Sequence, residues 1–106
     1  VLLRDKQISP ELKAKLDIVA AKRARVNDLQ NQIEAQGRAL KAIGEDQTRL
    51  RENMRVLDRS SKLYQSYEKK LGEQEERIAK IDAEIERLQG AKRGAETELQ
   101  AAISSL

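Results

Sequence analysis

The sequence contains no cysteine and no histidine. Without cysteine the chain can form neither a disulfide framework nor a thiolate site, and nothing defines its redox compartment. Without histidine as well, zinc and most transition metals lose their usual protein ligands. No set of polar residues converges in a catalytic pattern either. We therefore predict no catalytic residue, no cofactor and no metal site, and we do not expect this chain to be an enzyme.

Large apolar side chains are also scarce. The 106 residues include two tyrosines and one proline, and neither phenylalanine nor tryptophan. So few large side chains cannot fill a thick globular core. No apolar run approaches the ~20 residues with which a helix crosses a bilayer, so insertion into a membrane is not expected.

Charged residues and straight or small side chains make up most of the chain. Charged residues account for 37% and apolar residues for 39%, and Ala, Glu, Lys, Leu, Arg and Gln dominate. This mixture is typical of long helices and coiled coils. Disorder is the competing interpretation, and the periodicity of the apolar residues has to distinguish the two.

Apolar residues recur at alternating steps of three and four in both halves of the chain. In the second half the stripe consists of Tyr64, Tyr67, Leu71, Gln74, Ile78, Ile81, Ile85, Leu88, Lys92, Ala95, Leu99, Ala102 and Leu106. In the first half it consists of Val26, Leu29, Ile33, Gln36, Leu40, Ile43, Gln47, Leu50, Met54 and Leu57, preceded by Leu12, Leu16, Val19 and Arg23. A period of about 3.5 residues over this length predicts a coiled-coil seam and argues against disorder.

The two stripes do not join in phase through one straight helix, because Tyr64 is followed by Tyr67 where the repeat requires residue 68. Folding back about a midpoint between Ser60 and Ser61 does align them. We therefore predict an all-α fold, a long antiparallel two-helix coiled-coil hairpin with its turn near residues 58–61. A straight helix that pairs with a second chain is the alternative.

The boundaries follow from local signals. Ser9 is a helix cap, Pro10 suits the first helical position, and Asp58, Ser60 and Ser61 can cap a second helix. The predicted organisation is a flanking segment from a preceding domain at residues 1–8, coiled-coil arm one at 9–58, a turn at 59–61 and coiled-coil arm two at 62–106. Because the chain starts at a valine, we expect a piece of a longer protein.

The predicted pairing places two polar seam residues opposite each other. Gln47 falls opposite Gln74, and a buried polar layer of this kind is expected to set the register of the coiled coil at some cost in stability. Flanking charges are expected to pair across the seam, among them Asp46 with Arg77 and Arg25 with Glu98. Such exposed pairs help to set register more than stability.

Charge is distributed unevenly around the predicted turn. Residues 49–70 contain seven basic and three acidic residues, a net charge of +4, whereas the whole chain carries +3. The candidate interaction tip consists of Arg51, Arg55, Arg59, Lys62, Tyr64, Lys69 and Lys70. It is typical of helical arms that contact an acidic partner or RNA. The competing interpretation is that the tyrosine belongs to the seam and that several arginines pair locally.

The stretch Thr48–Glu75 resembles the helical segment of an uncharacterised bacterial family labelled mucoidy-inhibitor-like. The matching elements are Arg51-Glu52-Asn53-Met54, Leu57-Asp58-Arg59, Ser61, Leu63-Tyr64 and Lys69-Lys70-Leu71. Members of that family set such a segment beside β-rich domains, which this sequence does not contain. The resemblance implies a helical arm from a larger bacterial protein, and it supplies no catalytic residues.

Two classes of function remain. The first is a structural or protein-interaction arm, acting as a spacer, a docking module or a self-association module such as a homodimer of hairpins. The alternative is an arm that contacts nucleic acid through its basic tip. The modest net charge and the lack of an aromatic platform for base stacking rank nucleic acid second.

Overall fold

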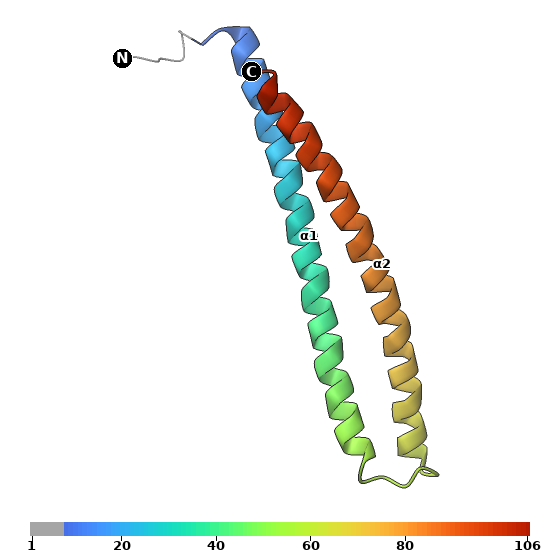
Figure 1. Cartoon of the computed structure of the whole chain (residues 1–106). Helices are drawn as coiled ribbons and strands as arrows, with labels where there is room; N and C mark the ends of the chain where they lie inside the picture. Colours follow the sequence, from blue (N-terminus) through green and yellow to red (C-terminus); the bar gives the residue numbers. More distant parts are fainter. Residues whose placement is uncertain (1–7) are drawn as a thin grey trace. The chain divides into compact units, whose positions relative to one another are not determined.

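The computed structural model describes residues 8–106. Two helices, α1 (Pro10–Met54) and α2 (Lys62–Ser104), are joined by a connection at residues 55–61 (Figure 1). The helices run antiparallel, and the described part of the chain contains no strand. These observations confirm the predicted all-α hairpin. Apart from Ile8, the predicted flanking segment lies outside the described residues.

The start of α1 agrees with the capping signals in the sequence. The backbone N–H of Leu12 donates to Ser9 Oγ at 3.0 Å, which satisfies one of the free donors of the first turn. Pro10 is the first helical residue and Glu11 lies in the first turn, where a carboxylate favours the positive end of the helix dipole.

The first helix ends earlier than predicted, at Met54 rather than at residue 58. Beyond Met54, the N–H of Leu57 donates three residues back, to the Met54 carbonyl, at 3.2 Å. Asp58 Oδ1 then accepts from the backbone N–H and the hydroxyl of Ser60, at 2.9 and 2.8 Å. Tight turns and a side chain that binds nearby backbone both compete with helical hydrogen bonds, so the helix ends four residues before the boundary predicted for arm one.

The second helix begins where the sequence places a cap. Ser61 Oγ accepts from the backbone N–H of Tyr64 at 3.1 Å, and Lys62 is the first helical residue. The predicted turn at 59–61 is therefore the last part of a longer connection. The cap formed by Ser61 thus sets where α2 begins after the connection.

The described chain divides into two compact units. We call Ile33–Arg87 the connection unit, and residues 8–32 together with Leu88–Leu106 the terminal unit. In the terminal unit the hydrogen bonds from Lys15 to Ser105 and from Lys22 to Glu98 show that the two stretches run antiparallel. In the connection unit the short connection reverses the chain, and Gln74 of α2 donates to Asp46 of α1.

Burial in the connection unit follows the predicted stripe. Leu50 is 0% exposed and Ile43 is buried, and both glutamines of the predicted polar layer are buried as well. Tyr64 is half-buried, as its place on the stripe predicts. The core of this unit is thus a single row of seam side chains, which is the core that a two-helix arrangement can form.

The terminal unit follows the stripe only in part. Leu29, Leu88 and Ala95 are buried, as predicted. Leu12 and Leu16 are exposed, and so is Arg23, so these predicted seam positions were wrong.

The reason lies at the end of α2. Lys15 Nζ donates to the carbonyl of Ser105, close to the last residue of the chain, at 3.2 Å. The turn of α1 that holds Leu12 therefore has no helix of the described residues to pack against. Further along α1, Lys22 rather than Arg23 is half-buried and reaches α2.

Candidate functional site at the connection

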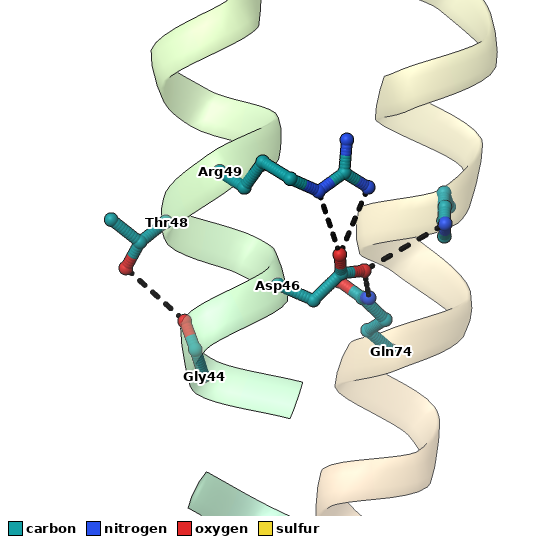
Figure 2. Close-up of polar contacts among 6 residues, drawn as sticks. Gly44, Asp46, Thr48, Arg49 and Gln74 are labelled. Carbon is teal, nitrogen blue, oxygen red and sulfur yellow. Dashed lines mark hydrogen bonds and ion pairs between the residues drawn. The ribbon is translucent and has the colours of Figure 1, made fainter. Parts of the chain in front are cut away.

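The predicted polar layer is buried, but its two amides do not bind each other. Gln47 and Gln74 are each 6% exposed. Gln47 Nε2 donates to Glu75 Oε1 at 3.1 Å. Gln74 Nε2 donates to Asp46 Oδ2 at 2.6 Å (Figure 2). Each amide thus binds a carboxylate one residue away from the partner that the sequence placed opposite it. The pairing about Ser60 and Ser61 is therefore accurate to one residue.

Asp46 is the centre of this polar cluster. Arg49 donates to Asp46 Oδ1 through Nε at 3.0 Å and Nη2 at 2.9 Å, and Gln74 approaches the other carboxylate oxygen (Figure 2). Lys70 Nζ lies 3.7 Å from the same oxygen as Gln74. The pKa of the Asp46 carboxyl is lowered, chiefly by the hydrogen bonds from Arg49 and then by that from Gln74.

The predicted charge pairs are replaced by others. Asp46 pairs with Arg49 and Lys70 instead of Arg77. Glu98 pairs with Lys22 at 2.9 Å instead of Arg25, which lies 3.5 Å from Asp28 on its own helix. In both cases the carboxylate pairs with a basic residue at least three positions away from the predicted partner, or with one on its own helix.

The polar layer is not fully satisfied. Gln74 Oε1 is buried and accepts no hydrogen bond from any residue that the structure describes. Rotating the amide by half a turn would not help, because it would turn the carbonyl oxygen toward the Asp46 carboxylate. An unpaired buried acceptor costs about 1 to 3 kcal/mol. The burial predicted for both glutamines is confirmed, and their role in setting the register stays a prediction.

The residues of the candidate interaction tip surround the connection. Arg51 lies in the last turn of α1, Arg55 and Arg59 lie in the connection, and Lys62 begins α2. All four are exposed. The remaining members, Tyr64, Lys69 and Lys70, follow in the first part of α2.

Most of the basic tip residues have no carboxylate partner. Arg55 lies 3.5 Å from Glu52, both side chains being largely exposed, and Lys70 approaches Asp46. Within residues 8–106, no ion pair joins a carboxylate to any of the other basic members, which are Arg51, Arg59, Lys62 and Lys69. Of the arginines in residues 49–70, Arg49 and Arg55 pair with a carboxylate three residues earlier, so the expectation of local pairing holds for these two and not for Arg51 and Arg59 among the described residues.

A groove gathers four members of the tip. It has a volume of about 460 Å³ and is lined by Arg51, Met54, Arg55, Leu57, Arg59, Tyr64 and Leu71. We call it the tip groove. Lys62, Lys69 and Lys70 are outside this lining. The seam residues Met54, Leu57 and Leu71 form its apolar part.

Sequence reasoning missed the apolar lining because it assigned those residues to a closed seam. The early end of α1 at Met54 leaves the last seam positions open to a groove. It also missed two exposed apolar side chains in the same region, Val56 at 86% and Leu63 at 50% exposure. Neither residue lies on the stripe. The only sequence signal that could have identified them as exposed was that each is an apolar residue off the stripe and close to the turn.

A second groove lies within the terminal unit. It measures about 540 Å³ and is lined by Ala21, Lys22, Arg25, Ala91, Gly94, Ala95 and Glu98. We call it the terminal groove. Its charged residues already have partners, because Lys22 pairs with Glu98 and Arg25 with Asp28. The tip groove is therefore the stronger candidate for a binding site.

Within residues 8–106, no group of three or more acidic, histidine or cysteine side chains is placed to hold a metal ion. Neither described helix combines the length and apolar character needed to cross a membrane. No protein-family model, curated protein or solved structure matches the chain.

Proposed function

We propose that this chain is a protein-interaction arm, in which the two-helix hairpin is the scaffold and the connection end docks an acidic protein partner. One observation carries the proposal. Arg51 and Arg59 line an open groove and have no ion-pair partner among the described residues. An arginine that pairs with a carboxylate of the same chain stabilises the fold. An unpaired arginine beside a groove is free to bind the carboxylate of a partner.

The resemblance to the mucoidy-inhibitor-like segment supports the same proposal, because it implies an arm within a larger bacterial protein. Contact with nucleic acid ranks second. Tyr64 and Tyr67 are both half-buried, and of the two only Tyr64 lines the tip groove, so the tip has no row of exposed aromatic rings on which successive bases could stack.

Site-specific cross-linking in cells of the source organism tests the proposal. A photoreactive amino acid would replace Leu63, which is exposed beside the tip, in the full-length protein. The matched control carries it at Lys41, an exposed position of α1 in the same unit. We expect a protein adduct from position 63 and none from position 41. Adducts at neither position would identify the arm as a spacer, and a nucleic-acid adduct at 63 would favour the second class.

The charge dependence of the adduct is the second half of the test. Replacing Arg55, Arg59 and Lys62 with glutamate should abolish the adduct, because all three basic side chains are exposed and off the seam. The control is the same reversal at three exposed basic residues elsewhere in the unit, Arg38, Lys41 and Lys80. An adduct that survives the reversal at the tip would contradict the proposal.

A further inference from the structure

The tip groove combines two chemistries that are seldom adjacent on a solvated helix end. Its apolar lining comes from Met54, Leu57 and Leu71, and its charged lining from three arginines. A groove that served only the packing of the hairpin would need no arginine. A purely electrostatic patch would need no apolar lining. The ligand should therefore match both.

We propose that the tip groove binds a short acidic peptide segment that inserts one apolar side chain between the arginines. This inference rests on the proposed function and specifies the partner's chemistry. The apolar side chain would contact Met54, Leu57 and Leu71. The flanking carboxylates would bind Arg51 and Arg59.

Charge complementarity favours an acidic ligand. Among the arginines that line the groove, only Arg55 pairs with a carboxylate of residues 8–106, and its 3.5 Å contact with Glu52 joins side chains that are 75% and 58% exposed. Such an exposed pair is weak and exchanges readily for another carboxylate. The first turn of α2 contains no acidic residue, so no carboxylate there offsets the positive end of the helix dipole. Planar guanidinium groups bind carboxylates through two parallel hydrogen bonds.

The apolar surface distinguishes this ligand from other anions. In addition to the apolar lining, two apolar residues that are close in sequence to the groove residues are exposed, Val56 at 86% and Leu63 at 50%. A nucleic acid would use the arginines but would leave the apolar lining uncovered. An anionic membrane would cover Val56 and Leu63 but has no side chain to place against the apolar lining of the groove. A peptide can contact the arginines, the apolar lining and the exposed apolar side chains together, as peptide segments do when they bind a groove through one or two anchor residues.

The only methionine of the chain, Met54, lines the groove and supplies a single reporter signal. The probe is a synthetic peptide with one leucine flanked on each side by glutamates, titrated into the full chain while the Met54 methyl resonance is followed by NMR. We expect a saturable shift of this resonance. Replacing the peptide's leucine with serine should weaken binding about tenfold, because the anchor no longer buries apolar surface.

The arginines are tested with a matched pair of variants. Arg51→Gln with Arg59→Gln should weaken peptide binding about a hundredfold, at about tenfold for each charged hydrogen-bond partner lost. Arg38→Gln with Lys41→Gln removes the same charge from exposed positions of α1 and should leave the affinity within about a factor of two. Circular dichroism must show both variants as helical as the unchanged chain.

Three results of the peptide titration would overturn the inference, and a fourth comes from the cross-linking experiment. The first is peptide binding that leaves the Met54 resonance unmoved, and the second is equal affinity for the leucine and serine peptides. The third is tighter binding of a single-stranded oligonucleotide or of phosphatidylserine-containing vesicles than of the peptide. A steep loss with added salt would mark the oligonucleotide result as counterion release. A cross-linked partner at position 63 without peptide binding would overturn this inference alone, whereas no adduct at 63 would overturn the proposed function itself.

Discussion

The terminal groove and the tip groove are built on the same pair of helices but differ in how their charges are used. In the terminal groove, Lys22 pairs with Glu98 at 2.9 Å, and Arg25 lies near Asp28. In the tip groove, Arg51 and Arg59 have no such partner within the described residues. Basic residues are therefore present in both grooves and available for a ligand in only one of them.

The difference follows from where each groove lies along the helices. Within a helix, residues three or four positions apart lie side by side, so a basic residue commonly finds an acidic neighbour, as Arg87 does with Glu84. A facing helix adds further partners, as it does for Lys22. Arg59 lies in the connection, where neither kind of neighbour is available. Arg51 and Arg59 therefore differ from the basic residues of the terminal groove in having no ion pair with a described carboxylate.

The largest expected effect tests whether the two units are equally well packed. Leu50 in the connection unit and Leu29 in the terminal unit are 0% and 2% exposed. We expect Leu50→Ala and Leu29→Ala each to lower the free energy of unfolding by about 2 to 5 kcal/mol, measured by urea denaturation. Leu16→Ala, at a 41% exposed position, should cost far less. A small cost at Leu50 alone would mean that the polar layer leaves the connection unit loosely packed.

The polar layer should reduce stability where it lies. Replacing both Gln47 and Gln74 with leucine removes the unpaired acceptor and adds apolar burial, so we expect a gain of about 1 to 3 kcal/mol in the free energy of unfolding. The same change should loosen the register or alter the oligomeric state, which light scattering would detect. A lower melting temperature with unchanged association would show that the amides are net stabilising.

Asp46 should make the connection unit sensitive to acid. Its pKa is lowered in the folded chain, so its stabilising effect is complete above the usual value of 3.8 and is lost as the pH falls through the lower folded-state pKa. Thermal melts from neutral to acidic pH should show a smaller loss for Asp46→Asn than for the unchanged chain. Asp82→Asn, at an exposed position of α2, is the control and should keep the full loss. Equal losses in all three proteins would deny Asp46 this role.

The smallest effect is expected in the terminal unit. Lys22 and Glu98 form a cross-helix ion pair at 2.9 Å, but their side chains are 35% and 67% exposed. Water and salt screen such a pair, so Lys22→Ala should change the free energy of unfolding by about 0.5 kcal/mol or less. A coupling energy of more than about 1 kcal/mol between Lys22 and Glu98, measured in a double-mutant cycle with Glu98→Ala, would mean that this ion pair is comparable in energy with the polar layer.

Individual residues show how far sequence reasoning extends. Ser9 and Ser61 were recognisable as caps because capping depends on a residue and its neighbours two or three positions on. Leu50 and Leu88 were recognisable as core because the stripe places them on the inner face. Leu16 was not recognisable as exposed, because its exposure depends on where the other helix ends. The tip residues were found from charge alone, and their apolar neighbours in the groove were not.

The sequence by itself determined two helices, the face that each buries, and an antiparallel pairing centred between Ser60 and Ser61, because a 3.5-residue period and its mirror symmetry are properties of residue order. Only the tertiary structure decided that α1 ends at Met54, that Asp46 binds Gln74, and that the arginines meet around a groove. The reason is geometric. One residue is about 100° around a helix, so a shift that leaves the seam pattern almost unchanged gives every polar side chain beside it a different neighbour.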